Sequence, residues 1–150
     1  GKRSGVVLCG TCGNGKTTMM RAFQNLLNVL RLPDDYHKKT YGIPVVNAGH
    51  IAHLCRSDYE RFLNLCNTEM LGIDDMGTEP LEVQEFGNIH RPMVDLLTKR
   101  YENGTFTFIT TNLVPQQIRD LYGERIADRL NEMADKIIFK NPSFRSWRHG

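Results

Sequence analysis

The chain has 150 residues, of which 40% are hydrophobic and 24% are charged, a composition that is ordinary for one globular domain. Its net charge of +2 is too small to require nucleic acid as a partner, although Lys140, Arg145 and Arg148 lie near the C-terminus with no acid among them. No apolar run approaches the roughly 20 residues that a membrane span needs, and no signal-peptide pattern opens the chain, so we expect no membrane association.

Four cysteines raise the question of a metal site or a disulfide. Cys9 and Cys12 have the C-x-x-C spacing of zinc sites, but a structural zinc site needs further ligands, and a metal here would obstruct the neighbouring glycine-rich loop. We therefore interpret Cys9, Cys12, Cys55 and Cys66 as buried or half-buried free thiols. Free thiols are typical of a reducing compartment, and the expected location is cytoplasmic.

In the first half of the chain, short apolar runs alternate with amphipathic stretches. Residues 5–9 (GVVLC) predict a strand that is buried on both faces. Apolar residues then recur at spacings of three and four and predict a helix with one apolar stripe: Met20, Phe23, Leu27 and Leu30. Residues 44–46 predict a second strand, and residues 49–56 and 58–67 predict two helices.

The second half continues the alternation. Residues 70–73 predict a buried strand, residues 77–88 a glutamate-rich loop, and residues 89–101 a helix that Asn103-Gly104 stops. The remaining predicted elements are a strand at 105–110, a helical stretch at 115–133 that breaks at Gly123, and a last strand at 136–139. Five strands alternating with helices predict an α/β fold, namely a five-stranded, mainly parallel sheet flanked by helices on both faces.

Residues 10–17 (GTCGNGKT) match the P-loop pattern G-x-x-x-x-G-K-[ST]. Glycines let the backbone turn its N–H groups toward phosphates, Lys16 brings a charge to the β- and γ-phosphates, and the Thr17 hydroxyl is a Mg²⁺ ligand. The context agrees, because an apolar strand precedes the loop and an amphipathic helix follows it. The predicted ATP-binding residues are Gly10, Thr11, Cys12, Gly13, Asn14, Gly15, Lys16, Thr17 and Thr18.

Acidic side chains follow the strand at 70–73 directly. Ligands of an open α/β sheet bind at the carboxyl ends of its strands, so we predict that Asp74 holds Mg²⁺ together with Thr17. Asp75 is predicted to orient or deprotonate the attacking water, with a solvated loop acid as the alternative. Glu79 is a weaker candidate for the same role.

Two further segments carry polar groups that suit phosphate chemistry. Asn112 follows the strand at 105–110, where an amide can bind both the γ-phosphate and the water, and the alternative is a helix cap. Arg125 and Arg129 are four residues apart on one face of a helix whose Ile126 and Leu130 can pack inward. Such an arginine can act on a neighbouring subunit's phosphate, and the alternative is an exposed helix with paired charges.

Four segments, GTCGNGKT, LGIDDMG, ITTN and GERIADRL, resemble in this order the AAA+ ATPases of the DnaC/IstB group, which are helicase loaders and transposition helper ATPases. The resemblance runs from Val6 to about Arg145 and implies one AAA+ domain over residues 1–150. By the motif match, the implied roles are Walker A for Lys16 and Thr17, Walker B for Asp74 and Asp75, sensor 1 for Asn112, and arginine finger for Arg129 with Arg125 as its companion.

The resemblance also implies partners. It implies a homo-oligomer with ATP between subunits, binding of single-stranded DNA, and either a replicative helicase or a transposase as protein partner. In this group a helical insertion after the second strand contacts DNA; here it corresponds to residues 49–67, with His50, His53, Arg56 and Arg61 as candidate contacts. For His50 and His53, an ordinary surface position is an equally good interpretation. No helical lid is evident after Phe139, and the N-terminal partner-binding region is expected to be missing before Gly5.

The sequence thus favours a slow ATPase of the helicase-loader type, because many AAA+ proteins have the longer glutamate where this chain has Asp75. An IstB-like transposition helper is the alternative. A small-molecule kinase on the same P-loop scaffold is a further alternative, for which we find neither a lid nor an acceptor-pocket motif. The last alternative is a binding module that uses ATP as an assembly signal with negligible hydrolysis.

Overall fold

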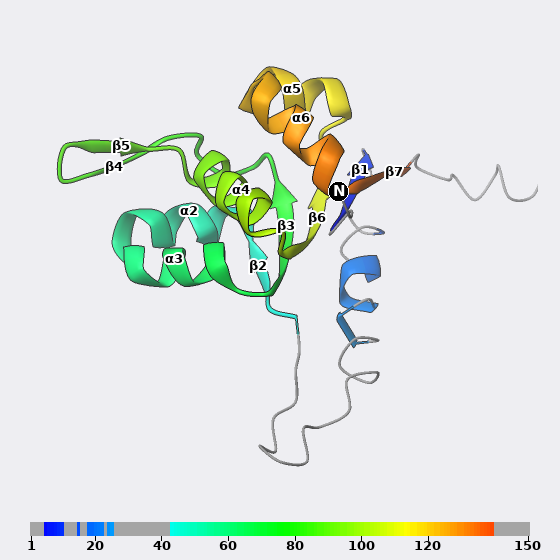
Figure 1. Cartoon of the computed structure of the whole chain (residues 1–150), viewed down its shortest axis with the longest axis horizontal. Helices are drawn as coiled ribbons and strands as arrows, with labels where there is room; N and C mark the ends of the chain where they lie inside the picture. Colours follow the sequence, from blue (N-terminus) through cyan, green and yellow to red (C-terminus); the bar gives the residue numbers. More distant parts are fainter. Residues whose placement is uncertain (1–4, 11–14, 16–17, 23, 26–42, 140–150) are drawn as a thin grey trace, which may run out of the picture.

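The protein is described by a computed structural model that covers residues 5–10, 15, 18–22, 24–25 and 43–139. Its central sheet has five strands in the order β2-β3-β6-β1-β7, and every neighbouring pair is parallel (Figure 1). The strands are β1 (Gly5–Gly10), β2 (Val45–Asn47), β3 (Met70–Met76), β6 (Phe106–Thr111) and β7 (Asp135–Phe139). The predicted five-stranded parallel sheet is confirmed.

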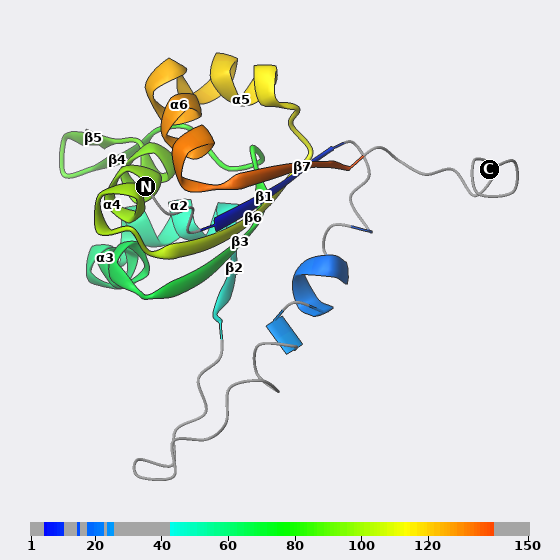
Figure 2. The same cartoon turned by 45° about the vertical axis from the view of Figure 1, so that its right-hand side comes forward.

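Helices cover both faces of this sheet. One face carries α2 (Ala48–Ser57), α3 (Tyr59–Asn67), α4 (Pro92–Asn103), α5 (Pro115–Tyr122) and α6 (Glu124–Met133). Figure 2 shows the helical residues 18–22 and 24–25 on the opposite side of the sheet. The predicted break at Gly123 is confirmed, since it separates α5 from α6 with a φ of +98°.

Two apolar clusters explain why the strands read as nearly continuous hydrophobic runs. In β1, Val7 and Cys9 pack into the cluster under α2 to α6, whereas Leu8 packs with Met20 and Phe108 on the other face. Successive side chains of a strand point to opposite faces, so a strand covered on both faces needs apolar residues at every position. The sheet therefore lies at the centre of the core, with both of its faces covered. The carboxyl ends of its strands are the part of the sheet where a ligand can bind.

A hairpin replaces part of the predicted loop at 77–88. Its strands β4 (Val83–Glu85) and β5 (Asn88–His90) pair in antiparallel fashion, and Phe86 and Gly87 form the two-residue turn with φ values of 49° and 81°. Positive φ at both central positions is the geometry of a type I′ turn, which usually contains Asn-Gly or Asp-Gly. Phe86 stands where asparagine or aspartate is usual, so the sequence did not indicate this turn. The Phe86 side chain is 96% exposed.

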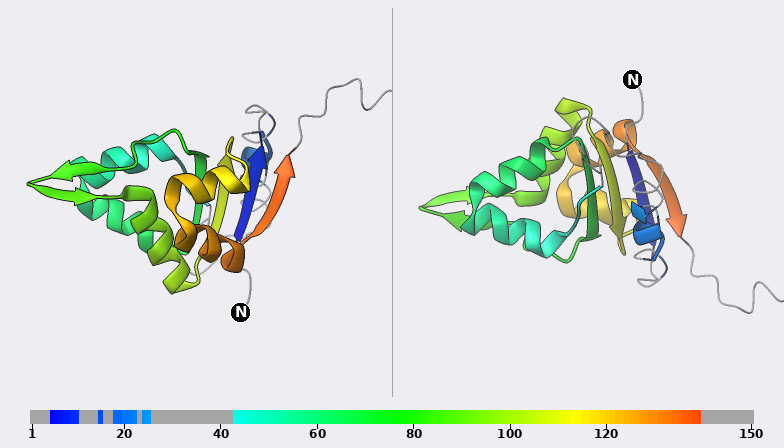
Figure 3. Two further views of the ribbon diagram at one scale, coloured as in Figure 1. Left: turned by 90° about the horizontal axis from the view of Figure 1, so that it is seen from above. Right: turned by 90° about the horizontal axis from the view of Figure 1, so that it is seen from below.

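The start of the following helix was also predicted wrongly. Ile89 lies in β5 and is 61% exposed, and α4 begins three residues later at Pro92. Proline suits this first helical position because its missing N–H would have no partner there. In both views of Figure 3 the hairpin, coloured light green, projects outward past the helices.

Some predictions fall outside the described residues. Met20 is helical and buried as expected, but Phe23, Leu27 and Leu30 are not described. The same holds for residues 140–150, which include the basic residues near the C-terminus and the region where no lid was expected. Among the helices that the structure describes, none is long and apolar enough to cross a membrane.

Candidate nucleotide-binding site

The carboxyl ends of β1, β3 and β6 meet at one edge of the sheet. In the strand register, Thr111 lies opposite Cys9 on one side and opposite Met76 on the other. Gly10 ends β1 with a φ of +154°, a region that favours glycine, and Asn112 follows β6 directly. The first residue of the P-loop pattern, the predicted sensor and the loop after the paired acids therefore share this edge.

The predicted phosphate loop is described only at its margins. Gly15 and Thr18 are helical, which agrees with a helix that begins directly behind the loop. Thr11, Cys12, Gly13, Asn14, Lys16 and Thr17 lie outside the described residues. The phosphate cradle itself therefore stays a prediction.

The paired acids occupy an irregularity at the end of β3. The register between β3 and β6 shifts between Ile73 and Met76, and Asp75 has a φ of 58°. Asp74 and Asp75 are both half-buried. Aspartate and asparagine enter this left-handed region more readily than longer residues. The backbone thus gives a physical reason for aspartate, and not glutamate, at position 75.

Thr110 holds both acids from the neighbouring strand. Its hydroxyl donates a hydrogen bond to Asp74 Oδ1 at 2.5 Å and accepts one from the Asp75 backbone N–H at 3.0 Å. Thr110 is 1% exposed, so this hydroxyl orients the Asp74 carboxylate and the Asp75 backbone in a place that excludes most water. Sequence reasoning assigned no role to Thr110, although a hydroxyl in a strand buried on both faces must find a partner.

Thr111 fixes the bend that leads to Asn112. Its hydroxyl donates to the Met76 carbonyl at 2.6 Å and accepts from the Leu113 N–H at 3.0 Å. Asn112 itself is exposed, and the N-cap position of α5 is Val114. The helix-cap alternative for Asn112 therefore does not hold, and the residue directly follows β6 at the carboxyl edge of the sheet.

Glu79 lies inside the protein and does not face the sheet edge as a free base. It is 6% exposed, its Oε1 accepts a hydrogen bond from the Gly77 N–H at 2.7 Å, and its Oε2 accepts one from the Tyr122 hydroxyl at 2.5 Å. Burial, together with this bond, raises the pKa of Tyr122, so the tyrosine keeps its proton. Glu79 is therefore poorly suited to act as the base, and the role of Asp75 stays a prediction.

The two arginines of α6 lie away from this edge. The Arg129 guanidinium sits 5.1 Å from the centre of the Tyr101 ring and donates to the Thr98 hydroxyl at 3.2 Å. Both partners belong to the C-terminal half of α4, which leads to the amino end of β6, and a six-residue strand spans roughly 20 Å. Arg125 is exposed and lines a surface hollow together with Arg129 and Tyr101. Ile126 and Leu130 are buried, as predicted.

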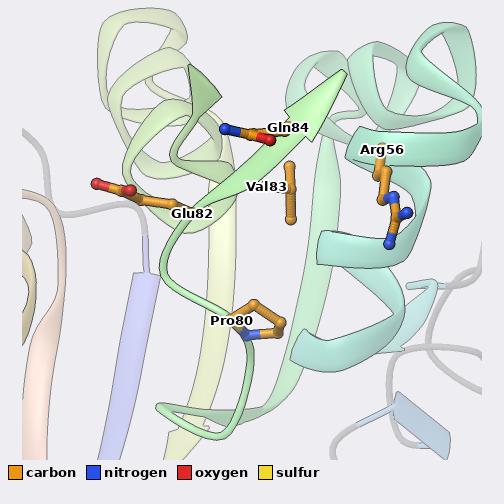
Figure 4. A pocket seen from close by; sticks show the side chains of 5 residues that line it. All are labelled: Arg56, Pro80, Glu82, Val83 and Gln84. Atoms are coloured by element: carbon orange, nitrogen blue, oxygen red, sulfur yellow. The ribbon is translucent and has the colours of Figure 1, made fainter. Parts of the chain in front are cut away.

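A second hollow lies between α2 and residues 80–84, which include the start of β4. Figure 4 shows Arg56 of α2 on one side and Pro80, Glu82, Val83 and Gln84 on the other. Along α2, the side chains of His50, His53 and Arg56 are exposed, and the two imidazole rings stack at 6.2 Å. The opposite side of the helix is buried. The predicted DNA-contacting residues of α2 thus share one solvent-facing stripe.

The cysteines that the structure describes are free thiols inside the core: Cys9, Cys55 and Cys66. Burial raises the pKa of Cys55 to about 12 and that of Cys66 to about 11, so both stay protonated and unreactive. Among the described residues, no group of three or more His, Cys, Asp and Glu side chains is arranged to hold a metal ion. Cys12 lies outside these residues.

Comparison with solved structures finds chains with a similar fold. The DnaC helicase loader superposes with a TM-score of 0.67 at 22% identity, over 91% of this chain and 78% of that one. DnaI superposes with a TM-score of 0.67 at 21% identity, over 91% and 73% of the two chains. AMPPCP-bound DnaA from Aquifex aeolicus has a TM-score of 0.58 at 19% identity, over 88% of this chain and 39% of that one.

No protein-family model and no curated protein matches the sequence. At these identities the structural likeness concerns the fold. The chain has the P-loop fold of the DnaC-type AAA+ ATPases.

Proposed function

We propose that this chain is an ATP-binding and ATP-hydrolysing AAA+ protein of the helicase-loader type, which assembles on single-stranded DNA in the cytoplasm and delivers a replicative helicase. The observation that carries the proposal is the pair Asp74 and Asp75, held by Thr110 at the sheet edge where the P-loop strand ends. The likeness to the DnaC helicase loader and to DnaI supports the loader assignment.

The donor set at this edge suits Mg²⁺. Carboxylate and hydroxyl oxygens are the hard ligands that this ion prefers, and Asp74 offers a half-buried carboxylate whose orientation Thr110 fixes. Asp74 and Thr17 would hold the ion, which when bound neutralises charge on the β- and γ-phosphates. The AMPPCP-bound DnaA neighbour supports nucleotide binding on this fold.

In this proposal, three residues of the chain bind the phosphates and position the attacking water. Lys16 binds the β- and γ-phosphates, Asp75 orients the attacking water and accepts its proton, and Asn112 binds the water and the γ-phosphate. Asp75 suits this task because the bulge and its hydrogen bond to Thr110 set its backbone. Direct positioning and charge are the main means by which a protein accelerates phosphoryl transfer.

Arg129 completes a neighbouring subunit's site in this proposal. It packs on α4 toward the amino edge of the sheet, whereas its own nucleotide would lie at the carboxyl edge. An arginine so placed serves a second copy of the chain, as arginine fingers in trans do. The exposed stripe His50, His53 and Arg56, with Arg61 on α3, is the proposed contact with DNA phosphates.

Replacement of Arg129 by alanine is expected to lower ATP turnover at least 100-fold, because an arginine finger typically contributes 10³–10⁵ in rate. Turnover of the parent should rise more steeply than linearly with protein concentration and should rise further with single-stranded DNA. The measurement is phosphate release against protein concentration, with and without an oligothymidine strand. ATP affinity should stay within about twofold, since the finger acts on another subunit's nucleotide.

The matched control is Arg119→Ala on α5, which removes an arginine that pairs with Asp128 at 3.1 Å on the surface. An exposed ion pair contributes little, so this variant should behave like the parent. Parent turnover that is strictly proportional to concentration and indifferent to DNA, with Arg129→Ala equally active, would rule out the assembly mechanism. ATP binding and assembly without turnover would instead favour a nucleotide-gated binding module.

Replacement of Thr110 by valine is expected to lower turnover roughly tenfold and to raise the Mg²⁺ concentration needed for half-maximal rate. Valine keeps the shape of threonine but removes the hydroxyl that orients Asp74 and accepts from the Asp75 N–H. Loss of such an orienting partner typically costs ten- to a hundredfold at a metal site. Thr110→Ser keeps the hydroxyl and should retain most activity, and equal loss in both variants would contradict the assignment.

A further inference from the structure

Glu79 connects the loop after β3 to Tyr122 of α5, which lies 43 residues further along the chain than Glu79. Its carboxylate is buried, with one oxygen accepting from the Gly77 N–H and the other from the Tyr122 hydroxyl. A buried carboxylate is costly unless hydrogen bonds compensate the loss of water, and both oxygens are engaged here. The connection is therefore a specific structural link.

One end of the link lies directly behind the catalytic acids. Gly77 follows Asp75 by two residues and has a φ of +110°, and a Cβ at this position would meet Leu113 side-chain atoms at 2.8 Å. The Met76 carbonyl next to it accepts from Thr111, which also sets the bend before Asn112. A displacement of Asp75 therefore reaches Glu79 through two residues of tightly held backbone.

The other end lies at the start of the arginine helix. Tyr122 is 2% exposed and is the last residue of α5, and Gly123 forms the junction to α6. The Ala127 N–H donates to the Gly123 carbonyl, so the junction is continuous with the first turn of α6, which carries Arg125. Arg129 follows one turn later. A movement of Tyr122 is therefore passed to both arginines.

We propose that the Glu79–Tyr122 hydrogen bond couples the nucleotide state of a subunit's own site to the position of the arginines that the subunit offers to its neighbour. The inference rests on the proposed function. Packed interiors pass small displacements on because side chains there have few alternative arrangements. Glu79 and Tyr122 are positioning residues in this scheme, and neither touches the nucleotide.

The link is tested by amide hydrogen exchange at a protein concentration where light scattering finds single subunits. AMPPCP with Mg²⁺ is the probe, so no neighbour and no turnover contributes. In the parent, nucleotide should slow exchange at least threefold in residues 70–77 and change it to a similar extent in residues 123–130. Tyr122→Phe and Glu79→Ala should keep the first response and lose the second.

Glu79→Gln is the decisive companion variant. A glutamine amide oxygen accepts from the Gly77 N–H while its NH₂ group donates to the Tyr122 oxygen, so both bonds survive. This variant should keep the α6 response and most of the turnover, whereas a catalytic base at Glu79 would make it inactive. Tyr59→Phe, which removes another tyrosine hydroxyl on α3, should behave like the parent.

The possible outcomes distinguish a failure of the Glu79–Tyr122 link from a failure of the proposed ATPase function. An α6 response that persists in Tyr122→Phe and Glu79→Ala, or is absent from a parent that binds AMPPCP, would overturn the link and leave the proposed ATPase function standing. Loss of the response in Glu79→Gln as well would show that the carboxylate charge matters more than the bond, which also overturns the link. A parent that binds no nucleotide would overturn both.

Discussion

Replacement of Asp75 by asparagine is expected to lower ATP turnover 100-fold or more while the fold and the affinity for ATP stay unchanged. A positioned general base typically contributes about 10²–10⁴ in rate, and an amide cannot accept the proton of the attacking water. Asparagine adopts the left-handed backbone at φ 58° as readily as aspartate. Phosphate release, ATP titration and the thermal midpoint Tm of the variant measure the three quantities.

Asp75→Ala separates the chemistry from the backbone. Alanine at a positive φ costs roughly 1–2 kcal/mol, so this variant should lose stability as well as turnover. A marked fall in Tm for alanine alone, with both variants inactive, is the expected pattern. Turnover of the asparagine variant within about threefold of the parent would show that Asp75 is not the base.

The fold was predictable because its signals are local. Apolar runs covered on both faces, the break at Gly123 and the acids after residues 70–73 each lie within a few residues of the element that they define. The hairpin was missed because Phe86 occupies a turn position where asparagine is usual, so the turn carries no local mark. Tertiary packing of Val83 and His90 stabilises this hairpin where propensity does not.

The position of the paired acids in the fold was predictable, whereas the hydrogen-bond partners of these acids were not. Asp74 and Asp75 follow from their place after a buried strand. Their partner Thr110 lies 35 or more residues away, and only the register of β3 with β6 brings it there. The same applies to Tyr101 beneath Arg129, which depends on how α4 packs against α6. Such contacts are properties of the folded chain and leave no periodic pattern in the sequence.

Arg100 is the clearest case of a residue that is buried although its residue type is normally exposed. Arginine is almost never fully buried, yet this side chain is 0% exposed. It donates to the Leu65 and Thr68 carbonyls at the end of α3, and to the Phe106 carbonyl and Thr107 hydroxyl at the start of β6. Burial lowers its pKa to about 10, which still leaves it charged at neutral pH.

Arg100→Met is therefore expected to lower the free energy of unfolding by about 3 kcal/mol or more. Methionine fills much of the volume but removes the guanidinium donor from three carbonyls and a hydroxyl, and a buried polar group that loses its partner costs about 1–3 kcal/mol. The positively charged guanidinium also faces the C-terminal end of α3, where the helix dipole is negative. The uncharged methionine side chain cannot balance that negative charge. Urea unfolding followed by circular dichroism measures the loss.

Two further variants test whether the loss of stability comes from the guanidinium group of Arg100. Arg100→Lys keeps the charge but places a single ammonium where five N–H donors were, so it should fall between the parent and the methionine variant. Lys99→Met removes an exposed cation from the same helix and should change stability by less than about 0.5 kcal/mol. A loss below about 1 kcal/mol in Arg100→Met would mean that water replaces the guanidinium, and that the junction of α3, α4 and β6 is held by apolar packing alone.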